Sequence, residues 1–278
     1  MKEFYIPILP INLEKNTDEK LNDMEVPGIE LEYPWSQYKS RSLFTGVFIA
    51  AGKDGLAASF CAEVPGSKVV ARRTEDKTKV YEDDCLEFFI MPGTSTTTNA
   101  AQTTRTAQKN AIYYAWEINP NGACLDYRVF VGDDAEKLTS GAGGTDASAT
   151  DTTHNTAETA TKTYDGGEKI FGILSDTVAD VPLLFDYDWK SHAVKRIQID
   201  DDFWYLELFI PWSDLGLTEP PAPGTTWYGT ANRVDAGARS RAVAGTKRSE
   251  SPGLLCLLDE TELPSFHQPK HFAAFHFE

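Results

Sequence analysis

Three strand-like segments of the sequence each place one glutamate among aromatic and aliphatic residues: Glu87, Glu117 and Glu207. Side chains of a β-strand point alternately to its two faces, so these segments predict strands with one apolar face and one mixed face. All three glutamates fall on the mixed face, next to an aromatic residue. Carboxylates bond hydroxyl groups, and aromatic rings pack on sugar C–H surfaces. The pattern is therefore typical of a surface that binds sugars.

The same pattern has other interpretations. The glutamates can be solvent-facing strand residues paired with arginine or lysine across a sheet, or members of internal salt bridges between partly buried sheets. Glu87 and Glu117 can also be the two carboxyl groups of a glycoside hydrolase, because their strands can be neighbours. The sequence contains no Gly-x-Ser-x-Gly, His-Glu-x-x-His or phosphate-loop motif that would indicate another hydrolase or nucleotide chemistry.

The elements that position these residues are short strands separated by turn residues. β-Branched and aromatic residues alternate with polar ones between Gly, Pro, Asn and Asp. The predicted strands are residues 42–50, 55–64, 84–91, 112–119, 123–131, 169–174, 194–200, 203–210, 226–234 and 272–277. Many short strands with this punctuation predict an all-β protein with a single β-sandwich of about ten antiparallel strands. Leu86, Phe88, Ile118, Leu206 and Leu208 are expected to share its core.

Two stretches interrupt the strand pattern. Residues 93–111 are rich in Thr, Ala and Gln, and residues 139–168 are rich in Thr, Gly, Ala and Asp. Neither holds enough apolar surface to offset the entropy of ordering it, so both are expected to be long inserted loops. No segment resembles an interdomain linker. Residues 1–278 are therefore interpreted as one domain.

The overall composition restricts the partners. The chain has 278 residues, of which 41% are hydrophobic and 24% charged, and a formal net charge of −16. This acidity argues against nucleic acid and against anionic membrane surfaces, which bind clustered Lys and Arg. Carboxylates are also the ligands of calcium, and Asp200, Asp201 and Asp202 resemble a calcium-binding loop, although they are more typical of an acidic hairpin turn.

The termini and cysteines bear on the compartment. No apolar run reaches the roughly 18 residues of a membrane span, and the first residues do not resemble a signal peptide. The expected location is cytoplasmic if the chain is complete as given, and secreted if a leader was removed. The four cysteines lack C-x-x-C spacing, which argues against a zinc site and favours buried free thiols.

Five short segments carry a family resemblance through their residue types and their order. They are Asp83-Asp84-Cys85-Leu86-Glu87-Phe88-Phe89, Trp116-Glu117-Ile118-Asn119-Pro120-Asn121-Gly122, Trp204 through Pro211, Gly224-Thr225-Thr226-Trp227 with Ala231-Asn232-Arg233, and Phe266-His267-x-Pro269. Together they resemble the family 9 carbohydrate-binding modules, in the family-9-like branch with a DOMON-like β-sandwich. The resemblance runs from about Pro34 to the C-terminus.

The resemblance implies a non-catalytic domain that binds a mono- or oligosaccharide and suits bacterial polysaccharide utilisation. No cofactor is expected to be required, although calcium is possible as a structural ion; its ligands are left unassigned. The expected ligand-binding residues are two tryptophans for stacking and five polar residues for hydrogen bonds: Trp35 and Trp189, then Glu87, Glu117, Arg128, Arg233 and His267.

Alternatives to sugar binding remain open at this stage. Besides the hydrolase, the chain can be a structural module that has lost its sugar site. A related sandwich holds haem through a Met and a His, for which Met91 with His267, His271 or His276 can be nominated. His267 can equally be a hydrogen-bonded turn residue that fixes the last strand.

Overall fold

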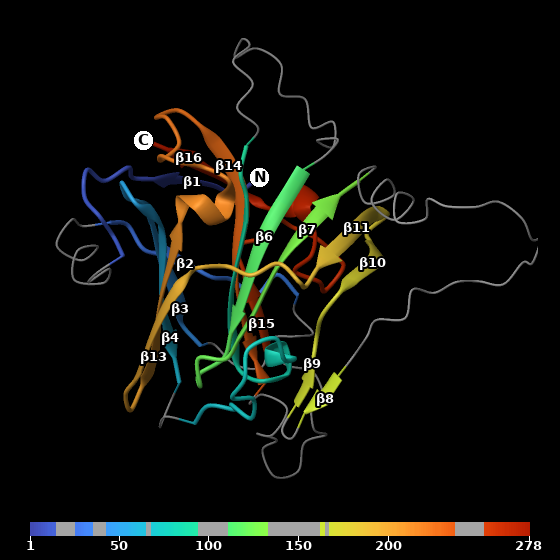
Figure 1. The fold of residues 1–278 in the computed structure, drawn as a ribbon. Helices are drawn as coiled ribbons and strands as arrows, with labels where there is room; N and C mark the ends of the chain where they lie inside the picture. Colours follow the sequence, from blue (N-terminus) through green and yellow to red (C-terminus); the bar gives the residue numbers. More distant parts are fainter. Residues whose placement is uncertain are drawn as a thin grey trace, which may run out of the picture.

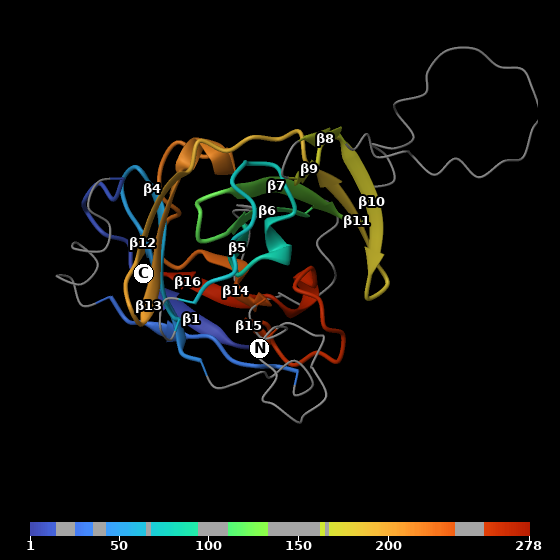
Figure 2. The same cartoon turned by 90° about the horizontal axis from the view of Figure 1, so that it is seen from below.

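The structure is a computed structural model that describes residues 1–14, 26–35, 43–64, 68–93, 111–132, 162–164, 167–236 and 253–278. Two β-sheets pack face to face as a sandwich, which confirms the all-β prediction (Figures 1 and 2). The described residues contain no α-helix, only short 3-10 turns such as Val80–Glu82, Trp212–Leu215 and Pro269–His271. None of their helices is long and apolar enough to cross a membrane.

The larger sheet has nine strands. In spatial order they are β1 (Glu3–Ile6), β16 (Ala273–Phe277), β14 (Thr226–Asp235), β5 (Cys85–Met91), β6 (Ala111–Ile118), β7 (Cys124–Val131), β11 (Val181–Asp186) and β10 (Ile173–Val178), with β15 (Gly253–Cys256) also paired to β14. Neighbouring strands run antiparallel except β1 and β16, which are parallel. The first and last strands of the chain therefore lie side by side.

The smaller sheet has five strands. They are β12 (Val194–Ile199), β13 (Phe203–Pro211), β4 (Gly55–Glu63), β3 (Thr45–Ala51) and β2 (Ile29–Glu30). A separate hairpin joins β8 (Lys162–Tyr164) to β9 (Gly167–Lys169).

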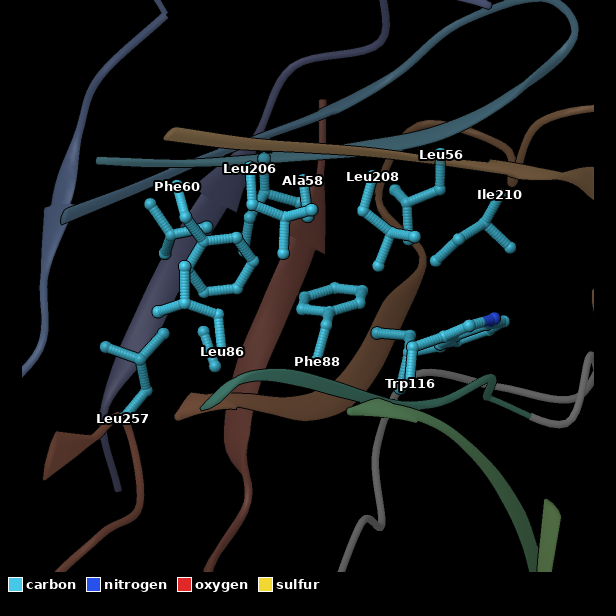
Figure 3. Packing of buried hydrophobic residues seen from close by; sticks show 14 of the residues in the cluster. Leu56, Ala58, Phe60, Leu86, Phe88, Trp116, Leu206, Leu208, Ile210 and Leu257 are labelled. Atoms are coloured by element: carbon cyan, nitrogen blue, oxygen red, sulfur yellow. The ribbon is translucent and has the colours of Figure 1, made fainter. Parts of the chain in front are cut away.

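The space between the two sheets is filled by the apolar faces of their strands. Leu86, Phe88 and Ile118 of the large sheet pack in one cluster with Leu206 and Leu208 of the small sheet, as predicted. Figure 3 shows side chains of this cluster meeting from both sheets. The three strand tryptophans, Trp116, Trp204 and Trp227, are also buried there. Period-two alternation was therefore sufficient to predict this core.

The opposite face of the large sheet is also covered, which the sequence did not predict. A second apolar cluster there includes Phe89, Tyr113 and Phe185 of the sheet together with Phe266 and Phe272. The covering segment is residues 257–272, which lies inside the curve of the sheet opposite β10 and β11 (Figure 2). Residues on this mixed face are consequently buried.

The structure contains more strands than the ten predicted ranges. The strands β1, β2, β8, β11 and β15 were missed; β2 is only two residues long, and β11 contains Pro182, which weakens a strand pattern. The range 169–174 was misplaced, because β9 ends at Lys169 and β10 begins at Ile173.

The two predicted loops lie mostly outside the described residues. Residues 94–110, 133–161 and 165–166 are not described, but β8 and β9 show that the end of the second stretch contains a hairpin rather than only loop. The division into domains stays a prediction.

Two motif positions hold a turn rather than face a ligand. Buried Asp83 accepts hydrogen bonds from the backbone N–H groups of Arg72 and Arg73 and from Asn119 Nδ2. The Asn119 side chain also accepts bonds from the backbone of the turn between β6 and β7, where Gly122 has φ +83°. A glycine suits that left-handed conformation. This bonding ties the β6–β7 turn to the segment that leads into β5.

Candidate functional site

Glu87 and Glu117 lie side by side on the mixed face of the large sheet. They occupy directly opposite positions in the antiparallel β5–β6 ladder, and Asn232 of β14 lies opposite Glu87 on its other side. Directly opposite residues have Cβ atoms about 4.5–5.5 Å apart, so their side chains share one region of the face. The sheet register thus brings two carboxyl groups together from positions thirty residues apart in the sequence.

These carboxyl groups border a pocket of about 330 Å³ between the large sheet and the segment 257–272. That volume lies at the lower end of the ~300–1,000 Å³ common for small-molecule sites. The lining residues are mainly aromatic and aliphatic, with three acidic side chains and one histidine. They are Tyr81, Glu87, Glu117, Leu174, Asp176, Phe185, Tyr187, Val234, Leu254, Pro264, Phe266 and His267.

Both glutamates are almost fully buried, with 3% exposure for Glu87 and 4% for Glu117. The Tyr127 hydroxyl donates to Glu117 Oε1 at 2.5 Å, and Asn232 Nδ2 donates to Glu87 Oε2 at 3.3 Å. Glu117 Oε2 is buried and has no hydrogen-bond partner among the described residues. Glu117, which lines the pocket, therefore carries one buried carboxyl oxygen with an unused acceptor site.

Burial makes the charged form of both glutamates unfavourable. Desolvation raises the pKa of Glu117 to about 7, although the hydrogen bond from Tyr127 opposes this shift. Desolvation also raises the pKa of Glu87 well above its usual value, and the neighbouring Glu117 adds to this effect. The carboxyl pair therefore retains a proton to a higher pH than exposed glutamates do.

His267 joins the pocket wall through two tyrosines. Its Nδ1 lies 2.9 Å from the Tyr113 hydroxyl and its Nε2 lies 3.4 Å from the Tyr127 hydroxyl. Desolvation lowers the pKa of His267 to about 4, so the ring is neutral near pH 7. The tautomer that satisfies every group has Tyr113 donating to Nδ1, Nε2–H donating to Tyr127, and Tyr127 donating to Glu117. This chain of bonds fixes Glu117 Oε1.

Aromatic rings form the rest of the wall. Phe185 and Tyr187 stack with ring centroids 5.9 Å apart and planes 11° apart, while the ring of His267 stacks on Phe89 at 5.0 Å. Tyr81, 37% exposed, lines the same pocket. Rings beside hydrogen-bonding groups offer both an apolar surface and in-plane polar contacts.

The two tryptophans predicted for stacking lie outside the pocket lining. Trp35 is buried, packs against Phe266 with ring centroids 5.9 Å apart, and donates its indole N–H to the Thr261 carbonyl. It therefore supports the covering segment from behind. Trp189 is half-buried and packs on the other side of the sheet, against Tyr114 and Trp116.

The two predicted arginines also point elsewhere. Arg128 pairs with Asp186 at 2.8 Å and lies over the ring of Phe130. Arg233 is buried and donates to Thr45 Oγ1 at 2.9 Å, on the face that meets the small sheet. Alternation explains this orientation, because its neighbour Asn232 faces the pocket side.

The pocket thus brings together Glu87, Glu117 and His267 of the seven predicted binding residues. It also uses Tyr187, Phe185 and Asp176, which the sequence did not single out, because strand β11 was missed and β10 misplaced. The sequence could have predicted a role for Tyr127. Tyr127 and Arg128 are neighbours in one strand, so only one of them can lie on the same face as Glu117, and the structure shows that it is Tyr127.

The part of the chain that the structure describes contains no evident metal-binding site. No group of three or more His, Cys, Asp or Glu side chains there is arranged to hold a metal ion. Asp200 instead accepts bonds from the backbone N–H groups of Asp202 and Phe203 in the β12–β13 turn. All four cysteines are free thiols, as predicted; Cys85, Cys124 and Cys256 are buried, whereas Cys61 is only partly buried. A structural calcium stays a prediction.

Comparison with known proteins shows which solved structures share this fold. No protein-family profile matches the chain, and no curated protein matches it. Among solved structures, a candidate carbohydrate-binding protein from Bacteroides uniformis aligns with 100% of this chain and 99% of its own, at a TM-score of 0.56 and 16% identity. This chain shares the fold of family 9 carbohydrate-binding modules.

That relation rests on a family 9 module from Caldicellulosiruptor kristjanssonii. Its complex with glucose aligns with 100% of this chain and 96% of its own, at a TM-score of 0.50 and 12% identity. Its complex with cellotriose gives the same TM-score and identity and covers 94% of that chain. At such low identity the likeness establishes the fold and leaves the binding site to be argued from this chain's own residues.

Proposed function

We propose that this protein is a non-catalytic carbohydrate-binding domain whose sugar site is the pocket bordered by Glu87, Glu117 and His267. The observation that carries the proposal is a buried carboxyl pair facing an aromatic-walled pocket, on a fold shared with modules solved with glucose and cellotriose. Tyr187 and Phe185 supply ring surface for sugar C–H groups. The carboxyl groups supply hydrogen bonds for hydroxyls.

A glycan array followed by titration calorimetry tests this proposal. Glu117→Gln keeps the shape of the side chain but changes its hydrogen-bonding groups, and is expected to weaken binding of the best glycan about tenfold or more. Glu207→Gln is the matched control, because Glu207 is also a strand glutamate but pairs with Arg196 on the other sheet. The affinity of the Glu207→Gln variant for the same glycan is expected to stay within about twofold of that of the wild type. Unchanged affinity in Glu117→Gln would place the sugar site elsewhere.

A second candidate is a glycoside hydrolase that uses the same carboxyl pair. The specific observation in its favour is that two glutamates with raised pKa values occupy opposite positions on neighbouring strands. Retaining hydrolases hold their carboxyl groups about 5–5.5 Å apart. Prolonged incubation with the bound glycan distinguishes the two functions. A binding domain leaves the glycan intact. Shorter sugars released by the wild type, but not by Glu87→Gln or Glu117→Gln, would establish hydrolysis.

A further inference from the structure

The charge balance of the pocket is one-sided. Glu87, Glu117 and Asp176 line it, whereas no lysine or arginine occurs among the described residues that line it. His267 is neutral near pH 7 because burial lowers its pKa to about 4. The described lining of the pocket is therefore acidic and includes no matching cation.

The hydrogen bonding of the pair leaves room for a donor from the ligand. Glu117 is 4% exposed, its Oε1 is held by Tyr127, and its Oε2 has no partner in the described part of the chain. A buried acceptor without a donor raises the free energy of the folded protein, and a ligand that donates a hydrogen bond to it removes this penalty. Among the described residues, Asn232 donates a long hydrogen bond of 3.3 Å to Oε2 of the neighbouring Glu87.

We propose that this pocket selects a sugar that carries a protonated amine, a hexosamine unit, over the same sugar with a hydroxyl or acetamido group at that position. An ammonium group has three N–H donors and one positive charge. One N–H reaches Glu117 Oε2 and another reaches Glu87, so the ligand supplies both the missing donor and the missing cation. This inference rests on the proposed function, since it names the sugar class of the same pocket.

Neutral sugars satisfy the site less completely. A hydroxyl donates one hydrogen bond and leaves the pair to be neutralised by a retained proton. An acetamido nitrogen donates one bond, carries no charge and adds bulk. Placing an ammonium ion beside a buried carboxylate favours the charged form of both groups. The preference for the amine should therefore depend on the carboxyl pair itself.

Three trisaccharides with one backbone provide the test: cellotriose, its fully 2-amino analogue chitosan trisaccharide, and the N-acetylated analogue. Calorimetry at pH 6 is expected to show the amino trisaccharide binding about tenfold or more tighter than the other two. In Glu117→Gln this ratio is expected to fall to within about threefold, with Glu87→Gln as the second variant should the first fail to fold.

Glu207→Gln controls for the net charge of −16, which attracts any cation. It removes the same formal charge far from the pocket, so it must retain the full preference. Equal affinities for cellotriose and the amino trisaccharide in wild type would overturn the hexosamine inference and leave the proposed function standing. An amine preference that survives both pocket variants would also overturn it. Absence of binding by these three sugars and by every array glycan would overturn the proposed function as well.

Discussion

Glu87, Glu117 and Glu207 occupy equivalent positions in their strands, yet their surroundings differ. Glu207 lies on the outer face of the small sheet, directly opposite Arg196, and forms an ion pair with it at 3.0 Å. Glu87 and Glu117 lie under the segment 257–272, without a described cation beside them. Alternation predicts which face a glutamate takes, but only the tertiary cover decides whether that face meets water or a pocket.

Burial of Glu117 should appear as a pH-dependent loss of stability. Its pKa in the folded state is about 7, above the value of about 4.3 in an unfolded chain. The stabilising contribution of the protonated group is therefore fully present below about pH 4.3 and is lost as pH rises through 7. The free energy of unfolding of wild type minus that of Glu117→Gln should fall by up to about 3 kcal/mol between pH 4.5 and pH 8, measured by urea denaturation.

The comparison is made as a difference between variants because His267 acts in the opposite sense. Its folded-state pKa is lowered to about 4, so it contributes stability above about pH 6.5 that is lost as pH falls. This contribution is common to both proteins and cancels in the difference. Parallel pH profiles for wild type and Glu117→Gln would show that the carboxyl group is not held in a desolvating site.

At the scale of elements, the strands hold the sandwich together through one shared apolar face. Leu206 of β13 is buried in the inter-sheet cluster, while Glu207, its neighbour, points away. Leu206→Ala should lower the free energy of unfolding by about 2–5 kcal/mol, because it removes buried methyl groups and leaves a cavity. Glu207→Ala is expected to cost less than Leu206→Ala, about 1 kcal/mol, because it removes a partly exposed ion pair and leaves no cavity in the inter-sheet core. Similar losses in chemical denaturation of both variants would contradict the assigned faces.

The sequence predicted the positions of those strands whose local residue pattern is clear. The long central strands around Phe88, Trp116 and Leu206 alternate clearly and were placed within a few residues. Trp35 and Trp189 were assigned to the site from loop-like context, but their packing depends on partners distant in sequence, Phe266 and Trp116. Which aromatic rings face the pocket depends on how the sheet curves at β10 and β11 and on where residues 257–272 pack against it. No local sequence pattern encodes that arrangement.

At the scale of the whole molecule, the two ends of the chain complete the large sheet. Strand β16 lies between β1 and β14, and its Phe275 and Phe277 are buried in the inter-sheet core. Phe272, the last residue of the covering segment, is buried in the second apolar cluster. The same C-terminal stretch therefore contributes to both cores and connects the sandwich to the wall of the pocket.

Removing residues 272–278 should consequently abolish cooperative folding. The truncation exposes the paired edges of β1 and β14 and removes three buried phenylalanines, each worth about 3–5 kcal/mol when truncated to alanine, against a typical total stability of about 5–15 kcal/mol. Thermal unfolding followed by circular dichroism should lose its sigmoidal transition, and limited proteolysis should degrade the chain rapidly. Removing only Glu278, which is exposed, is the control and should leave the midpoint within a few degrees. A truncated chain that still melts cooperatively near the wild-type midpoint would show that the sandwich closes without its last strand, and that the C-terminal stretch serves the pocket alone.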